Sequence, residues 1–96
     1  MPIEVRERRG KCYPVVVCDH CGEVISDAQD GNYEWQQGGG PVFFTHKRCC
    51  LAFEDARGGR SVWGACPLSV LPVYLAGNLK LDLREARRTA ALLASF

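Results

Sequence analysis

The sequence predicts a single α+β domain of 96 residues. In the first half, short β-branched and aromatic runs flank a row of three glycines, which is typical of paired strands. The last third holds segments whose apolar residues recur at helical spacing. Cysteine and histidine pairs also recur at short, equal spacing. Because so short a chain buries a modest core, an additional cross-link would help it to fold.

The first half is expected to contain three strands. Residues 1–11 are charged and are expected to be frayed or to form an edge segment. Residues 13–17 are rich in valine and predict a strand that runs directly into the first cysteine pair. Residues 32–35 and 42–45 predict two strands that are joined as a β-hairpin by the Gly-rich loop 36–41.

One helix is expected between the hairpin and the last third of the chain. It spans residues 47–57, beginning just after His46, and Gly58 and Gly59 end it as glycines commonly do. Residues 60–66 then read as a connector.

Two further helices are expected in the last third. Ser69 predicts the cap of the first, with Pro72 in its first turn, where a missing N–H does no harm, and its end near residues 77–78. Asp82 predicts the cap of the second, over residues 83–95. The second helix has one apolar stripe: Leu83, Ala86, Ala90 and Leu93. Both helices are expected to pack on the first half of the chain.

The paired cysteines and histidine have the spacing of a metal site. Cys18 and Cys21 are separated by two residues, and so are His46 and Cys49, with 24 residues between the pairs. A C-x-x-C turn directs two sulfurs at one centre, and two ligands three apart in a first helical turn project from one side. Three sulfurs and one nitrogen suit tetrahedral zinc, so the sequence predicts one zinc ion held by these four residues.

The order of these features resembles that of known zinc modules. A knuckle after a strand, then a hairpin, then a ligand-bearing helix is similar to a treble-clef zinc finger, and C-x2-C…H-x2-C resembles the first zinc module of a LIM domain. The resemblance covers residues 18–50, and the C-x-x-C-G-E-x-I start is similar to that of small uncharacterised bacterial zinc-finger proteins. A LIM domain continues into a second four-ligand module, whereas only Cys50 and Cys66 follow here. The resemblance thus implies a LIM-like or treble-clef zinc site and not a LIM protein. Together with the predicted elements, it gives one domain with a zinc-finger half over residues 12–59 and a helical half over 60–96.

Two alternatives for the ligand set remain open at this point. Cys50 could take the place of Cys49, and His20 lies inside the first pair. Four protein ligands close a zinc shell, whereas catalytic zinc keeps an open position, so a structural role and no enzymatic activity are expected. The competing possibility is an enzyme that uses the metal or Cys50 as a nucleophile, although only His20 could serve as its base.

Charge and hydropathy indicate which partners and which cellular location to expect. Twelve basic residues nearly cancel eleven acidic ones, so whole-chain charge favours neither nucleic acid nor a membrane surface. No apolar run approaches the ~20 residues of a membrane helix, and the charged N-terminus lacks a secretory apolar region. A cytoplasmic location is therefore expected, where thiols stay reduced and available to metal.

The expected function is a protein-interaction or regulatory module. The many aromatic residues could bind another protein or a second copy of the chain, as a homodimer, or could simply fill the core. The alternative is nucleic-acid binding, because residues 75–88 loosely resemble a helix-turn-helix. The basic residues that would contact phosphates are Lys47, Arg48, Arg84, Arg87 and Arg88.

Overall fold

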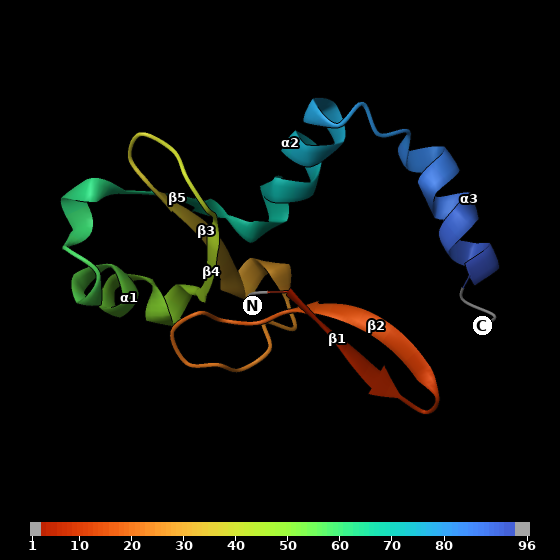
Figure 1. The fold of residues 1–96 in the computed structure, drawn as a ribbon, viewed down its shortest axis with the longest axis horizontal. Helices are drawn as coiled ribbons and strands as arrows, with labels where there is room; N and C mark the ends of the chain where they lie inside the picture. Colours follow the sequence, from red (N-terminus) through yellow and green to blue (C-terminus); the bar gives the residue numbers. More distant parts are fainter. Residues whose placement is uncertain (1–2, 94–96) are drawn as a thin grey trace.

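The computed structural model describes residues 3–93, and it shows the predicted α+β architecture as two small β-sheets and several helices (Figure 1). The strands are β1 (Ile3–Arg8), β2 (Lys11–Val16), β3 (Gly31–Gln36), β4 (Phe43–His46) and β5 (Trp63–Pro67). The α-helices are α1 (Cys50–Ala56), α2 (Leu71–Asn78) and α3 (Leu83–Leu93). Short 3-10 helices are η1 (Ala28–Asp30), η2 (Lys47–Cys49), η3 (Arg60–Val62) and η4 (Leu68–Val70). None of the helices within residues 3–93 is long and apolar enough to cross a bilayer.

Of the two alternatives expected for residues 1–11, frayed or an edge segment, residues 3–11 show the second, because β1 is an edge strand. β1 pairs antiparallel with β2 along its whole length, from Ile3 opposite Val16 to Arg8 opposite Lys11. The turn consists of Arg9 and Gly10, with φ of 53° and 78°. Positive φ at both central residues matches the right-handed twist of the strands, which is why two residues suffice here. The resulting hairpin extends from the body of the molecule (Figure 1).

The central sheet has the strand order β4-β3-β5. The predicted hairpin of β3 and β4 is confirmed, with Tyr33 opposite Phe44. The connector predicted over residues 60–66 was wrong, because β5 pairs antiparallel with β3 and places Gly64 opposite Trp35. The sequence of β5 shows no alternation of apolar and polar residues, so its strand conformation comes from pairing with β3.

Aromatic residues fill both faces of this sheet. Tyr33 and Trp35 stack on one face, with ring centroids 5.5 Å apart. On the other face Phe43, Phe53 of α1 and Trp63 contact one another, with centroid distances of 5.3–5.7 Å. Most of these aromatic side chains therefore belong to the core, whereas Trp35 and the exposed Tyr74 line an open hollow together with Tyr33.

Because Gly64 has no side chain, the Trp35 ring can pack against its backbone. A Cβ atom at position 64 would lie 2.7 Å from two carbons of the Trp35 ring, closer than unbonded carbons can approach. We expect Gly64→Ala to lower the free energy of unfolding by about 2 kcal/mol, because the ring would have to leave its stacking position. Chemical denaturation followed by tryptophan fluorescence would measure this change. Gly77→Ala provides a control, since nothing lies within 4 Å of a Cβ at that position.

The helix after the hairpin begins where the sequence predicts, although its first turn is the 3-10 helix η2 rather than α-helix. It ends at the predicted glycines, Gly58 and Gly59, whose φ values are 106° and 93°. The Gly59 N–H donates to the Glu54 carbonyl at 2.9 Å, which closes the end of α1.

The helix α2 ends at Asn78 and holds Pro72 in its first turn, as predicted. The predicted Ser69 cap was wrong, because Ser69 lies inside η4 and the cap residue is Val70, whose side chain makes no capping bond. A preceding 3-10 turn, which no sequence pattern indicates, moves the start of α2 by one residue.

The last helix has the predicted cap, but it does not pack as expected. The Asp82 carboxylate accepts from the N–H groups of Arg84 and Glu85 at 3.0 and 3.2 Å. The helix is described to Leu93, and the predicted residues 94–95 lie outside the described part. Its apolar stripe was expected to pack on the rest of the domain, but every described side chain of α3 is exposed except the half-buried Ala86. Figure 1 shows α3 standing apart from the sheet.

Candidate metal centre

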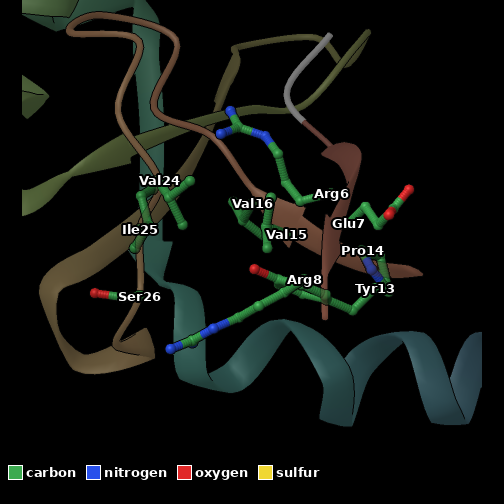
Figure 2. Close-up of a pocket in the computed structure, with 10 residues that line it drawn as sticks. All are labelled: Arg6, Glu7, Arg8, Tyr13, Pro14, Val15, Val16, Val24, Ile25 and Ser26. Carbon is green, nitrogen blue, oxygen red and sulfur yellow. The ribbon is translucent and has the colours of Figure 1, made fainter. Parts of the chain in front are cut away.

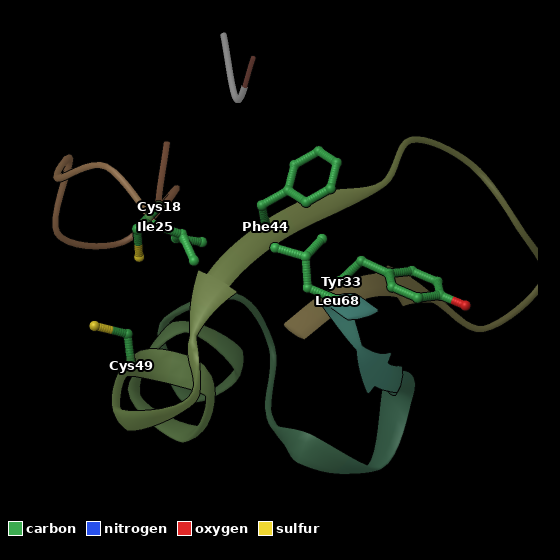
Figure 3. Close-up of a cluster of buried hydrophobic side chains, with 6 residues drawn as sticks. All are labelled: Cys18, Ile25, Tyr33, Phe44, Cys49 and Leu68. Carbon is green, nitrogen blue, oxygen red and sulfur yellow. The ribbon is translucent and has the colours of Figure 1, made fainter. Parts of the chain in front are cut away.

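The structure brings together the four residues that the sequence predicts as ligands. The ligand atoms of Cys18, Cys21, His46 and Cys49 all lie within 4.8 Å of one another. Three of the side chains are buried, and Cys21 is exposed. Figure 3 shows Cys18 and Cys49 with their sulfurs on the same side of the buried cluster that contains Phe44.

A tight turn after β2 positions the first pair. The Cys18 N–H donates to the Glu23 carbonyl at 2.9 Å, and the Gly22 N–H donates to the Cys18 carbonyl at 3.0 Å. Gly22 has φ of 78°, a conformation that glycine adopts without steric cost. This turn folds the chain back so that the sulfurs of both cysteines face one point.

Asp19 attaches the turn to the strand that carries His46. Its N–H donates to the Phe44 carbonyl at 2.7 Å, and its carboxylate accepts from the Phe44 N–H at 2.8 Å. Because Phe44 lies two residues before His46 on β4, this double hydrogen bond sets the distance between the two ligand pairs.

The groups around the Cys18 sulfur favour its thiolate form. Burial by itself raises the pKa of this thiol, but the N–H groups of Cys21, His46 and His20 lie 3.4–3.5 Å from the sulfur and outweigh it, lowering the pKa to about 6. Backbone donors that converge on one sulfur stabilise its negative charge, and a thiolate is the form that binds metal.

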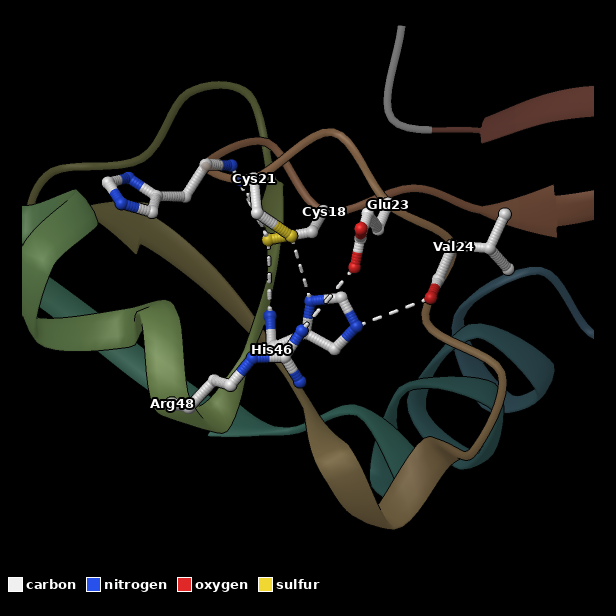
Figure 4. Close-up of polar contacts among 7 residues, drawn as sticks. Cys18, Cys21, Glu23, Val24, His46 and Arg48 are labelled. Carbon is white, nitrogen blue, oxygen red and sulfur yellow. Dashed lines mark hydrogen bonds and ion pairs between the residues drawn. The ribbon is translucent and has the colours of Figure 1, made fainter.

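The His46 ring presents one nitrogen to the cluster (Figure 4). Its Nδ1 lies 3.4 Å from the Cys21 sulfur, and its Nε2 lies 3.2 Å from the Val24 carbonyl oxygen. A carbonyl can only accept, so Nε2 carries the proton and donates, which leaves the Nδ1 lone pair directed at the sulfurs. A histidine that binds metal through one nitrogen and donates from the other has this arrangement.

The raised pKa of Cys49 indicates why the cluster suits a cation. Burial raises the pKa of its thiol to about 11, and the neighbouring sulfurs of Cys18 and Cys21 add to the rise. Three thiolates this close repel one another unless positive charge lies between them. A divalent cation at the centre would supply that charge and reverse the effect on Cys49. The residues present therefore fit one metal ion.

The alternative ligands lie elsewhere. The Cys50 sulfur contacts Glu34 and Glu54 instead of the cluster. His20 is exposed, and it is the backbone N–H of this residue that reaches Cys18. Cys12 is exposed and Cys66 is half-buried beside the core.

The basic residues considered for phosphate contacts fall into two groups. Lys47 and Arg48 lie in η2 beside the metal centre, where Arg48 pairs with Glu23 at 3.7 Å. The others lie on α3: Arg84, Arg87 and Arg88. In Figure 1, α1, which follows η2, lies at one end of the long axis and α3 lies at the other, so the two groups do not form one patch.

Sequence reasoning missed a second buried cluster, formed by Glu34, Cys50 and Glu54. The Cys50 sulfur lies 3.1 Å from Glu34 Oε1 and 3.0 Å from Glu54 Oε2, and the Thr45 hydroxyl donates to Glu34 Oε2 at 2.6 Å. Glu34 is fully buried and Glu54 is 6% exposed. A carboxylate in an alternating strand ordinarily faces solvent, so the sequence carried no signal that α1 would cover this face.

The hydrogen bonds of this second cluster depend on pH, because they need a proton on one of its carboxyl groups. One thiol hydrogen can serve only one of the two carboxylates that Cys50 contacts, so the other contact needs a proton on a carboxyl group. Burial raises the pKa of Glu34 to about 7, and Glu54 adds to the rise, while Thr45 and Cys50 oppose it. Burial, with Glu54 and Glu34, raises the pKa of Cys50 to about 12, which keeps this residue a thiol.

A separate hollow lies between the N-terminal hairpin and the segment that follows the first cysteine pair (Figure 2). Ten residues line it: Arg6, Glu7, Arg8, Tyr13, Pro14, Val15, Val16, Val24, Ile25 and Ser26. Neither a cysteine nor a histidine is among these residues, so this hollow lacks the donors that form the Cys/His cluster.

In comparisons with protein-family models, curated proteins and solved structures, this chain has no match. The resemblance to a LIM-type or treble-clef module therefore depends on the ligand spacing and the geometry described above.

Proposed function

We propose that this chain is a structural-zinc module of a reducing compartment that acts by binding protein. The donor set supports zinc, because three sulfurs and one imidazole nitrogen match its tetrahedral preference. Four protein ligands leave no position for a reacting water, so the metal acts as a cross-link and not as a catalyst. In this role it joins the turn after β2, the end of β4 and η2.

The observation that carries the binding role is the exposed apolar surface of the C-terminal third. Eight of the fourteen large apolar side chains that are exposed in the described part of the chain lie between residues 73 and 93. They are Val73, Tyr74, Leu75, Leu79, Leu81, Leu83, Leu92 and Leu93, with exposed fractions from 44% to 70%. Soluble domains rarely expose so many neighbouring apolar residues unless another molecule covers them.

The position of this surface supports the proposal. The metal centre and the central sheet contain most of the buried residues, and α2 is attached to them through Leu68 and Leu71, which contact the core. The exposed apolar residues thus lie on α2 and after it, next to this attachment, where a small domain can present a binding surface without unfolding.

Nucleic-acid binding is the weaker candidate, because the basic residues are divided between η2 and α3. Arg48 and Arg88 also each pair with a glutamate, at 3.7 and 3.2 Å. Sequence-independent phosphate binding needs a continuous basic surface. A duplex-DNA titration at two salt concentrations would reverse this order if it gave a steep loss of affinity with salt.

The interaction role predicts different outcomes for two adjacent alanines of α3. Ala90 follows Leu83 by seven residues and lies on the apolar stripe, whereas Ala91 follows Arg88 by three and lies on the basic side. Ala90→Asp is expected to remove a bound protein that Ala91→Asp retains, because only the first substitution places a charge in the apolar surface. Quantitative affinity purification with the wild type and both variants would test this.

The two variants are matched in residue type, exposure and helix position, so effects on helix stability cancel. If no protein, including a second copy of this chain, is retained by the wild type and lost by Ala90→Asp, the interaction role is wrong.

A further inference from the structure

The body of the molecule has an apolar groove of about 490 Å³. We name it the body groove and define it by six of its residues: Ile25, Ala28, Phe44, Leu68, Leu75 and Leu79. They come from the segment after the first cysteine pair, from β4, and from η4, α2 and the chain after α2. Nearly all of the lining is aliphatic or aromatic, so the groove suits an apolar helix face.

The body groove is continuous with the apolar stripe of α3. Leu81 and Leu83 also line the groove. Leu79 and Leu81, together with Ala86, Ala90 and Leu93, line a second hollow of about 510 Å³ along the helix. One apolar surface therefore passes from the sheet, across α2, and onto α3.

The helix of the same chain does not cover the groove. Its first residue, Leu83, already lies at the groove, and the rest of the helix extends away from the sheet (Figure 1). The linker from Leu79 to Asp82 is short, and Lys80 within it has φ of 52°. The stripe beyond Leu83 is consequently left exposed. At the groove Ala28, Leu75 and Leu79 are exposed, whereas Ile25, Phe44 and Leu68 are buried lining residues.

The charges beside the groove and on the helix are complementary. The segment that supplies Ile25 and Ala28 has no basic residue between residues 23 and 30. Of its three acidic residues, Glu23 pairs with Arg48, and Asp27 and Asp30 are exposed next to Ala28 in the sequence. α3 has three arginines and one glutamate, which gives it a net charge of +2. Opposite charges around an apolar contact favour one orientation of the partner and speed its approach.

We propose that the occupant of the body groove is α3 of a second copy of this chain, in a reciprocal, two-fold symmetric dimer. Each copy offers both halves of the contact, a groove with an acidic border and an apolar stripe with a basic border. A two-fold axis lets both halves be satisfied at once. This inference rests on the proposed interaction role and names its partner.

The mass of the purified, zinc-loaded chain tests the proposal. Sedimentation equilibrium between about 1 and 200 μM is expected to show a concentration-dependent shift from 10.6 kDa towards twice that mass. Ala90→Asp is expected to weaken the dimer about 100-fold or more, because both copies place a charge in the apolar contact. Ala91→Asp is the matched control and should dimerise as the wild type does.

The identity of the occupant is tested by isotope-filtered NMR on a mixture of labelled and unlabelled chains. Intermolecular contacts between the methyl groups of Leu93 and those of Ile25 or Leu68 are expected. A dimer without these contacts would mean that another surface mediates it, and the proposal would be wrong.

Two results distinguish failure of the dimer proposal from failure of the proposed interaction role. A chain that stays monomeric at 200 μM, while Ala90→Asp still loses a different bound protein, overturns the dimer and keeps the interaction role. A monomeric chain with no Ala90-dependent partner overturns both.

Discussion

Cys49→Ser is expected to abolish metal binding and cooperative folding, whereas the neighbouring Cys50→Ser retains both. Cys49 lies within 4.8 Å of the other three ligand atoms, and Cys50 faces Glu34 and Glu54. The free energy of structural zinc binding, about 10–16 kcal/mol in small zinc domains, contributes directly to folding. A domain of this size has a net stability of only about 5–15 kcal/mol, so loss of one ligand is expected to unfold it.

The measurement is metal content by mass spectrometry under native conditions, together with circular dichroism before and after chelation. Wild type and Cys50→Ser should contain one zinc ion per chain and unfold when it is removed, while Cys49→Ser should contain none. A serine at position 50 can still donate to a carboxylate, so its effect on stability should be small. Zinc bound by Cys49→Ser and lost from Cys50→Ser would show that the ligand set is different.

The buried Glu34 is expected to make stability fall as pH rises. Burial and the neighbouring Glu54 raise its pKa from 4.5 to about 7 in the folded chain. A carboxyl group whose pKa is raised on folding favours the folded state while it is protonated, and this contribution is lost as pH rises from the unfolded pKa through the folded one. The shift corresponds to a loss on the order of 3 kcal/mol between about pH 4.5 and pH 8.

Glu34→Gln should remove this dependence, because the amide keeps the shape of the side chain without its charge. Urea unfolding between pH 5 and pH 8 with excess zinc would give the free energy of unfolding of each protein. We expect the variant to gain about 2–3 kcal/mol relative to the wild type over this range, since changes in zinc ligation affect both equally. Glu7→Gln, at an exposed position, is the control and should follow the wild type. A constant difference between wild type and Glu34→Gln would mean that a cation, or another buried charge, compensates Glu34.

The features that could be predicted from the sequence are those with local causes. The β3–β4 hairpin follows from two β-branched and aromatic runs around a Gly-rich loop, and the end of α1 follows from Gly58 and Gly59. Asp82 caps α3 because a carboxylate before a helix accepts its first free N–H groups. The four convergent ligands follow from two pairs with equal spacing, and the structure brings these same four residues together.

The features that could not be predicted depend on pairing between distant segments. β5 is a strand because β3 offers it an edge, and Gly64 fits there because Trp35 covers it. Glu34 is buried because α1 packs over its face of the sheet. No local sequence pattern predicts this contact.

Taken by itself, the sequence determined the two closely spaced Cys/His pairs, the β3–β4 hairpin, the cap of α3 and the end of α1, because each depends on residues a few positions apart. Only the tertiary structure decided which face of the sheet α1 covers, that Cys50 contacts two buried carboxyl groups instead of joining the Cys/His cluster, and that the stripe of α3 stays exposed. The physical reason is that spacing governs which atoms can meet locally, whereas burial depends on which surfaces the whole chain has left to cover.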